Sequence, residues 1–348
     1  MIKERISVTN QEKIRFAVIG INHGHIYDQV NLLLEAGGEL AAFYAPEPDL
    51  AATFTKTYPQ AVQAESKAQI LEDPAIQLVT SAGIPNDRAP LGVEVMRHGK
   101  DYLSDKPGFT TLDQLAEARR VQAETGRIYS VFYAERLANP ATLRAGELVR
   151  AGAIGEVVQT IGVGPHKINL PSRPDWFFEH EKYGGIITDI GSHQMDQFLF
   201  FTGAKAPQVV FSQVANYHHP DYPELEDFGD VILRGENCSG YVRVDWFTPA
   251  GLPTFGDTRL TVIGTEGYIE VRKNLDIGGK PGANHLFLAD RQGVRYENCE
   301  KVEVPFARQL LDDIRNRTET AMTQAHCFLA SELTLQAEAQ AVRLGFLA

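Results

Sequence analysis

Short apolar runs alternate with segments of helical apolar spacing over the first part of the chain. The short runs predict buried strands and the periodic segments predict helices. Strict alternation of the two predicts a Rossmann-like α/β unit with a parallel, doubly wound sheet, in which ligands bind at the carboxyl ends of the strands. The expected strands lie at residues 14–19, 39–44, 76–80, 101–103 and 128–132.

Beyond Phe132 the pattern changes to longer segments in which apolar and polar residues alternate, and a glycine-rich turn at 264–267 indicates a hairpin. This pattern predicts an α+β domain with a large, mostly antiparallel open sheet. We therefore expect two domains, 1–133 and 134–348, the second ending in a helix over 323–344. Its expected strands lie at 156–163, 208–216, 228–234, 240–245, 259–263 and 268–272.

Composition narrows the class of protein. The 348 residues carry a net charge of −12, which argues against partners such as nucleic acid or an anionic membrane. No apolar run is long enough to span a bilayer, and the polar segment Met1–Lys13 does not resemble a signal peptide. The three cysteines lie far apart, as reduced thiols of a cytoplasmic protein would. His218, His219 and Asp221 lack a further ligand at a recognisable spacing, so we expect no metal.

A glycine turn, Gly20-Ile21-Asn22-His23-Gly24-His25, follows the first expected strand and precedes a helical segment. Strand, glycine turn and helix begin a dinucleotide-binding unit. Asn22 and His25 stand where that pattern has its second and third glycines. An ordinary strand–turn–helix therefore remains an alternative to a cofactor-binding turn formed by Gly20, Asn22, His23 and His25.

The acidic residue that usually holds the adenosine ribose should end the second strand. That position is Ala45, and Glu47 comes two residues later. No arginine stands nearby to bind a 2′-phosphate, so NAD and NADP both remain open, with a mild preference for NAD resting on Glu47. Further residues that follow strands are expected at the cofactor edge, namely Pro85, Asn86, Lys106 and Pro107.

Two motifs contain residues that could transfer a proton. Lys106 follows the strand at 101–103 and would lie at the ligand edge, although a lysine after a strand is more often simply solvated. In Gly184–His193, a helix would place Asp189 and His193 four residues apart on one face. A carboxylate that orients an imidazole makes a proton-transfer pair. The alternative is a core helix with a satisfied polar pair.

The loop 164–176 is long and rich in hydrogen-bond donors. Loops of this kind on a sheet domain often carry binding groups. We expect a hydroxylated or carboxylated substrate to be bound here, unless the loop merely wraps the surface. The candidate substrate-binding residues are His166, Asn169, Arg173 and Trp176.

These motifs occur in an order that resembles the glucose–fructose oxidoreductase / inositol dehydrogenase / MocA (Gfo/Idh/MocA) family: Lys106-Pro107, a Gly-Ala-Ile-Gly turn, Trp176, Gly184-Gly185 and Asp189-xxx-His193. The resemblance implies NAD(P)-dependent hydride transfer on a sugar, cyclitol or related polyol. It also implies that Lys106, Asp189 and His193 are the catalytic trio and that the Lys106-Pro107 bond is cis. Asp105 replaces the family's usual glutamate.

The leading hypothesis is accordingly a dehydrogenase or reductase acting on CH–OH groups. One alternative is an NAD-dependent enzyme that cleaves glycosides by transient oxidation. Another is a non-enzymatic, sugar-responsive binding protein on the same scaffold, motivated by the irregular glycine turn. The exposed face of the second sheet also predicts a homodimer or homotetramer.

Overall fold

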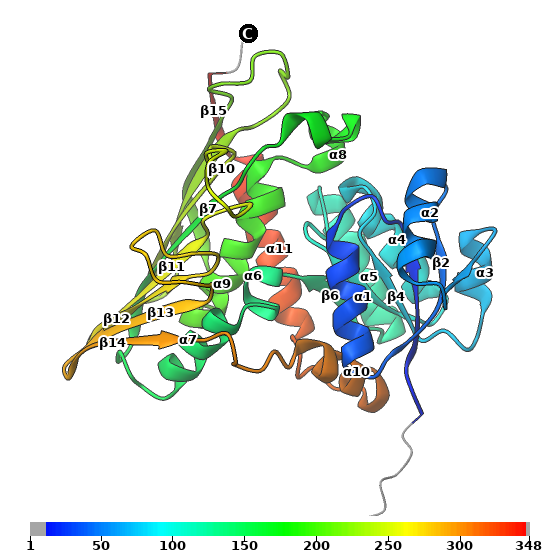
Figure 1. Cartoon of the computed structure of the whole chain (residues 1–348), viewed down its shortest axis with the longest axis horizontal. Helices are drawn as coiled ribbons and strands as arrows, with labels where there is room; N and C mark the ends of the chain where they lie inside the picture. The colour runs from blue at the N-terminus through cyan, green and yellow to red at the C-terminus, as the bar shows by residue number, and fades with distance from the viewer. Residues whose placement is uncertain (1–11, 346–348) are drawn as a thin grey trace, which may run out of the picture.

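The computed structural model describes residues 12–345, which form two sheet-based halves side by side (Figure 1). Residues 1–11 and 346–348 lie outside the described residues, and with them most of the segment Met1–Lys13 discussed above. No helix between residues 12 and 345 has the length and apolar character needed to cross a membrane.

The first half contains the predicted parallel, doubly wound sheet, and this prediction is confirmed. Its six strands run in the order β3-β2-β1-β4-β5-β6, all parallel, with helices on both faces. Such strands are covered on both sides, which is why they appear in the sequence as unbroken apolar runs. The strands are β1 (Arg15–Ile19), β2 (Glu39–Tyr44), β3 (Val62–Gln63), β4 (Leu78–Ser81), β5 (Asp101–Asp105) and β6 (Tyr129–Phe132). The helices are α1 (His25–Glu35), α2 (Pro48–Thr57), α3 (Lys67–Glu72), α4 (Pro85–Arg97) and α5 (Leu112–Thr125).

The second half contains a nine-stranded sheet in the order β14-β13-β12-β11-β7-β10-β9-β8-β15. It is antiparallel except at β10–β7 and β15–β8, which confirms the predicted mostly antiparallel sheet. Three of its strands, β13, β14 and β15, were not among the expected ones. The bounds are β7 (Val157–Pro165), β8 (Gln208–Ala215), β9 (Phe228–Arg234), β10 (Ser239–Asp245), β11 (Arg259–Gly264), β12 (Gly267–Arg272), β13 (His285–Asp290), β14 (Gly293–Asn298) and β15 (Val342–Leu344).

The C-terminal helix expected over 323–344 is shorter than predicted. Helix α11 covers Gln324–Ala339, and Val342–Leu344 instead forms β15, parallel to β8. The apolar residues of this last segment match helical spacing, but pairing with the open edge of β8 satisfies their backbone groups. The sheet edge, which is distant in sequence, overrides the local pattern.

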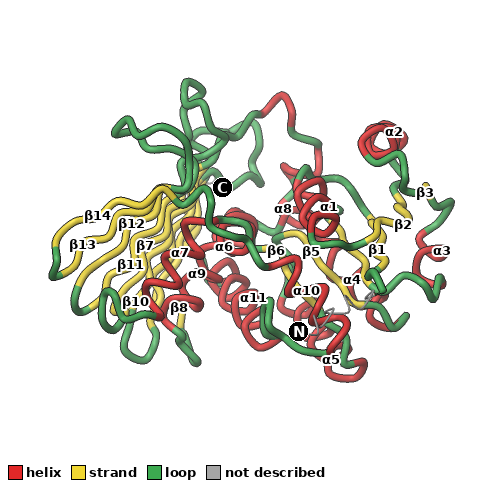
Figure 2. Tube along the Cα trace, turned by 60° about the horizontal axis from the view of Figure 1, so that its bottom comes forward, coloured by secondary structure: helices red, strands yellow, loops and turns green. Residues whose placement is uncertain are grey.

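Helices cover only one face of the nine-stranded sheet, the face turned toward the first half (Figures 1 and 2). The main ones are α7 (Pro140–Arg150), α9 (Ser192–Thr202) and α11, while the short α6 (Ala134–Leu137) leads into them. Helix α10 (Phe306–Asn316) packs against α1 of the first half. The remaining short elements are α8 (His180–Tyr183), the 3₁₀ turns Leu170–Ser172 and Asp175–Phe178, and a π-helical turn at Ile187–Gly191.

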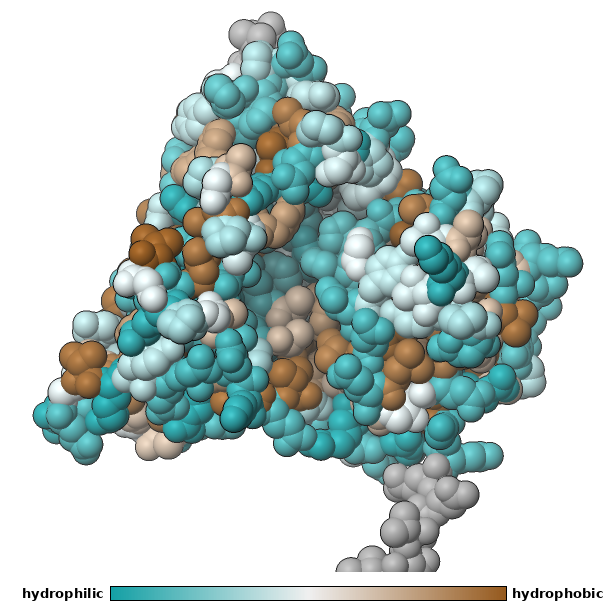
Figure 3. Space-filling view, viewed as in Figure 1, coloured by the Kyte–Doolittle hydropathy of each residue, from teal (hydrophilic) through white to brown (hydrophobic). Residues whose placement is uncertain are grey.

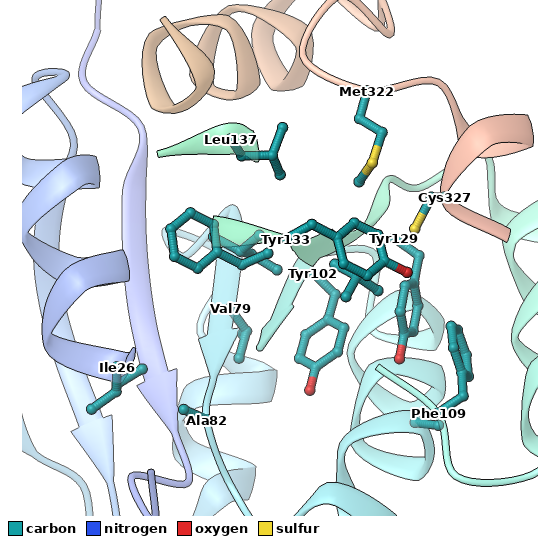
Figure 4. Close-up of a cluster of buried hydrophobic side chains, with 14 of the residues drawn as sticks. Ile26, Val79, Ala82, Tyr102, Phe109, Tyr129, Tyr133, Leu137, Met322 and Cys327 are labelled. Atoms are coloured by element: carbon teal, nitrogen blue, oxygen red, sulfur yellow. The ribbon is translucent and has the colours of Figure 1, made fainter. Parts of the chain in front are cut away.

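A shared core ties the two halves together. Figure 4 shows Met322 and Cys327, from the last part of the chain, beside Tyr129 and other buried side chains of the first sheet. The buried hydroxyl of Tyr133, directly after β6, also lies 3.0 Å from Oγ of Ser331 on α11. The carboxyl edge of the first sheet is therefore held against the helical face of the second.

Candidate active site between the two sheets

The glycine turn after β1 depends on a glycine at its first position. Gly20 has φ +81°, and a Cβ there would lie 3.0 Å from Cα of Gly83, which follows β4. A side chain at this position would strain the backbone and close the space between the two strand ends. Gly20 thus keeps open the groove in which a dinucleotide-binding unit receives its ligand.

An outer cavity of about 330 Å³ opens at this turn, and Gly20, Asn22 and Glu47 all line it. Nδ2 of Asn22 donates a 2.7 Å hydrogen bond to Oε1 of Glu47. The other oxygen, Oε2 of Glu47, is buried and has no hydrogen-bond partner among the described residues. Asn22 thus holds the late-placed acid in the cavity with one acceptor free, the arrangement that a ribose hydroxyl requires.

An inner cavity of about 150 Å³ lies deeper, between the two halves. Figure 3 shows the molecule hollowed between the two halves, where hydrophilic and hydrophobic residues both line the visible surface. Nine of the predicted site residues line it although they come from both halves of the chain: His23, His25, Pro85, Lys106, His166, Arg173, Trp176, Asp189 and His193.

Lys106 and Asp189 meet across the two halves. Nζ of Lys106, directly after β5, lies 2.7 Å from Oδ1 of Asp189 in the π-helical turn. The Lys106-Pro107 bond is cis, and the buried Arg88 side chain donates to the main-chain oxygens of both residues. Burial by itself would raise the pKa of Asp189, but the Lys106 ammonium lowers it below its usual value. The pair is therefore a buried ion pair.

His193 differs from its expected role. The predicted α-helical face is wrong at 187–191, where a π-helical turn precedes α9, and the Asp189 carboxylate bonds Lys106 instead of the imidazole. Nδ1 of His193 is buried and has no hydrogen-bond partner among residues 12–345. Burial lowers the pKa of His193 to about 3, so the ring is neutral at physiological pH.

Both histidines of the glycine turn are held by Asp105. Nδ1 of His25 lies 2.9 Å from Oδ1 of this carboxylate, and Nδ1 of His23 lies 3.1 Å from Oδ2. Burial would raise the pKa of Asp105, but His25, Arg88 and His23 hold it well below its usual range. The residue that replaces the family's glutamate therefore anchors the glycine turn to the end of β5.

The loop after β7 forms an aromatic wall of the inner cavity. The Arg173 guanidinium lies 4.1 Å from the ring centre of Phe177 and 4.9 Å from that of Trp246. Its Nε donates a 2.7 Å hydrogen bond to the main-chain oxygen of Ile168. Planar aromatic faces beside a positioned cation suit a ligand with both C–H faces and polar groups.

Three predicted site residues do not line either cavity. Asn86 uses its main-chain oxygen to accept from Gln114, and Asn169 has φ 50° at the start of a 3₁₀ turn. Pro107 is buried behind Lys106 and contributes through the cis bond. The structure thus gives Pro107 and Asn169 a place in the backbone that carries the site.

Sequence reasoning missed several residues of the inner cavity. The missed lining residues include Arg88, Glu135, Phe177, Trp246 and Phe255. Glu135 could have been found, because it closely follows β6 at the same sheet edge as Lys106. The aromatic residues could not, since only folding brings the loop after β7 and the segment after β10 together at the cavity.

Two groups of potential metal ligands converge in the described residues, each with its ligand atoms within 4.8 Å of one another. In the first, two histidines contact Asp105; in the second, His180, Glu226 and Glu338 surround the Arg343 side chain. Hydrogen bonds and ion pairs account for both groups. That the chain holds no metal stays a prediction.

Comparison with protein families shows which class of protein this site belongs to. Residues 14–133 match the family described as "Oxidoreductase family, NAD-binding Rossmann fold", and residues 142–270 match the "GFO/IDH/MocA C-terminal domain". The chain belongs to the Gfo/Idh/MocA family. As a member it is an NAD(P)-dependent oxidoreductase, which confirms the expected enzyme class.

Individual relatives agree with this membership. The chain is 26% identical over 267 residues to scyllo-inositol 2-dehydrogenase (NAD(+)) of Bacillus subtilis (strain 168), covering 74% of each protein. A provisionally named oxidoreductase from Erwinia carotovora atroseptica SCRI1043 has a crystal structure with TM-score 0.93 and 47% identity, covering 96% of this chain and 100% of that one. Levoglucosan dehydrogenase, solved with NADH and levoglucosan, shares the fold at TM-score 0.79 and 16% identity, over 94% and 98% of the two chains.

The buried, neutral His193 predicts a pH-dependent stability difference. The pKa of His193 falls from 6.5 to about 3 on folding, so the folded protein favours the neutral ring. The contribution of His193 to the free energy of unfolding is therefore fully present above pH 6.5 and is lost as the pH falls toward 3. Relative to His193→Asn, the wild type should lose up to about 2 kcal/mol of unfolding free energy between pH 6.5 and about 4.5. Urea unfolding across this range measures the difference. His218→Asn, at an exposed histidine, is the control and should follow the wild type; parallel curves for wild type and His193→Asn would contradict a neutral buried ring.

Proposed function

We propose that this enzyme transfers a hydride between a nicotinamide cofactor and a secondary alcohol or ketone of a cyclic polyol or sugar. The observation that carries the proposal is the ion pair between Lys106 and Asp189, which lines the inner cavity together with His193. Proton donors and acceptors gathered beside a dinucleotide groove are what alcohol oxidation requires.

The residues of the outer cavity fit the adenosine end of the cofactor. Glu47, held by Asn22, offers its free oxygen to the ribose diol, and Gly20 leaves room for the pyrophosphate. Lys106 and Pro85, which line the inner cavity, would hold the nicotinamide end of the cofactor. A bound nicotinamide would supply the acceptor for the hydride that leaves the substrate carbon.

Lys106 and His193 have separate roles when the substrate hydroxyl loses its proton. The neutral imidazole of His193 accepts the hydroxyl proton through its free Nδ1 as the carbonyl forms. Lys106 donates a hydrogen bond to the same substrate oxygen and stabilises its developing negative charge. Asp189 is a positioning residue, because its carboxylate holds the ammonium in place.

The lining of the inner cavity supports a compact, hydroxyl-rich substrate. Its aromatic wall suits the C–H face of a ring, while His166 and Arg173 offer polar contacts to hydroxyl groups. The relatives named for scyllo-inositol and levoglucosan act on molecules of this kind. Both are therefore the first compounds to test as substrates.

Replacing Lys106 with Met tests the proposed function. Loss of the ammonium should lower kcat/KM at least about a thousandfold, since both orientation and charge stabilisation are lost. The measurement is NADH or NADPH formation with scyllo-inositol, levoglucosan and a panel of related polyols. Lys205→Met, at an exposed lysine, should retain wild-type activity. Wild-type enzyme inactive on the whole panel with both cofactors would refute the proposal.

The charges of the outer cavity predict a preference for NAD over NADP. Glu47, Asp87 and Glu94 line it against the single cation of Lys67, which is itself paired with Glu94 at 2.5 Å. A 2′-phosphate would meet excess negative charge there.

Fluorescence titrations with NADH and NADPH check this preference. In Glu47→Gln the ratio of the two dissociation constants should move at least about tenfold toward NADPH, because one carboxylate that repels phosphate is removed. Glu72→Gln, at the exposed end of α3, should leave the ratio unchanged. Tighter binding of NADPH than NADH by the wild type would contradict the proposal.

A second copy of the chain is proposed to cover the outer face of the nine-stranded sheet. Directly paired residues across neighbouring strands form one apolar row on the face opposite the helices, running through Phe211, Ile232, Tyr241 and Ile161. Beyond β12 the row resumes with Phe287 and Tyr296. Phe211 and Ile232 are 40% and 44% exposed in the single chain. A self-complementary face of this kind favours a closed symmetric assembly.

Light scattering after size-exclusion chromatography should therefore give the mass of a homodimer or homotetramer at micromolar concentration. The double change Phe211→Lys and Ile232→Lys should shift the protein toward monomer, because charges would oppose each other across the interface. Val62→Lys, at an exposed apolar residue of the first half, is the matched control and should not. A monomeric wild type would refute the assembly.

A further inference from the structure

Glu135 carries a buried carboxylate that the proposed reaction does not use. It lies just after β6, in the short helix α6 (Ala134–Leu137), and lines the inner cavity together with His193 and His166. Its Oε2 accepts hydrogen bonds from Nζ of Lys273 at 2.6 Å and from Nε2 of Gln194 at 2.9 Å. One oxygen of this carboxylate is thus fully engaged by the protein.

The other oxygen has no partner. Oε1 of Glu135 is buried and receives no hydrogen bond from any residue between 12 and 345. Burial would raise the pKa of Glu135, but the Lys273 ammonium and neighbouring histidines hold it at about 2, so the carboxylate is ionised at neutral pH. An ionised oxygen can only accept, and leaving it unpaired out of contact with water is costly. The site therefore lacks a donor at this position.

Lys273 keeps the free oxygen in place. Its buried ammonium bridges Oε2 of Glu135 and Oε1 of Gln197, at 2.6 and 2.7 Å. The cation comes from the segment after β12, in the second half, so the folded sheet sets the direction of the carboxylate. With Lys106 and Lys273 already close by, a neutral donor fits this position better than another cation.

We propose that Oε1 of Glu135 accepts a hydrogen bond from a second hydroxyl of the substrate, one that does not react, and that Lys273 positions the carboxylate for it. This inference rests on the proposed function and deepens it, because it names the group by which the enzyme selects its polyol. A site built to bind a hydroxyl strongly rejects the analogue that lacks it. The enzyme should therefore discriminate against one deoxy isomer above all others.

Calorimetric titration of levoglucosan and its 2-, 3- and 4-deoxy analogues tests the inference, each into protein saturated with NADH. One deoxy analogue should bind the wild type about 30-fold or more weakly than levoglucosan. Glu135→Gln is an isosteric change that places an amide at this position. In this variant the affinity for levoglucosan should fall to that of the discriminated deoxy analogue, and the affinity for that analogue should stay the same.

Two further variants separate recognition from folding. Asp101→Asn, at a fully buried carboxylate paired with Arg317 at the far end of β5, should keep the wild-type discrimination. If Glu135→Gln does not fold, the double change Glu135→Gln with Lys273→Met removes both charges of the buried pair and restores a foldable core. That variant should also have lost the discrimination.

The outcomes separate the inference from the proposed function when NADH formation is measured in parallel. Discrimination that disappears in Glu135→Gln supports the inference, even if no turnover occurs and the proposed function fails. A different result overturns the inference and leaves the proposed function standing: the wild type turns over substrate, and Glu135→Gln lowers the binding affinity for all four compounds equally or for none of them. Failure of the wild type to bind or turn over any compound of the polyol panel, with either cofactor, overturns both.

Discussion

The ion pair between Lys106 and Asp189 is the interaction on which the arrangement of the site depends. It joins the carboxyl edge of the first sheet to the π-helical turn before α9, so neither half contains the chemistry alone. A buried ion pair forms only where geometry and further hydrogen bonds offset the loss of water. Here the buried Arg88 side chain supplies further hydrogen bonds, to the main-chain oxygens of Lys106 and Pro107.

Buried carboxylates organise the rest of the cavity in a similar way. Asp105 holds two histidines of the glycine turn, and Glu135 is held by Lys273, each carboxylate being wholly or almost wholly buried. Each fixes polar groups from distant parts of the chain around one small volume. Glu47 and Glu135 each leave one buried oxygen without a partner among the described residues, and these two oxygens are the acceptors proposed for ligand hydroxyl groups.

The fold followed from the sequence wherever burial imposes a simple period. Parallel strands covered on both faces appear as apolar runs, and half-covered strands alternate, so both sheets were predicted. Strand β14 was missed, since it lies largely exposed at the edge of the sheet and carries little apolar signal. Strand β13 was also missed, although its residues are largely buried. The strand β15 was taken for helix because the edge of β8, not the local pattern, determines its pairing.

For the site, the sequence by itself determined that Lys106 follows a strand and that Asp189 and His193 stand close together in one motif, and the family resemblance implied that the three act together. Tertiary structure decided how they connect. It paired Asp189 with Lys106 and left His193 neutral with a free nitrogen, because a π-helical turn changes the register that an α-helix would have. It also supplied Glu135, whose importance arises from the distant Lys273 and from burial. Such pairings depend on distances between segments far apart in the chain, which no local spacing encodes.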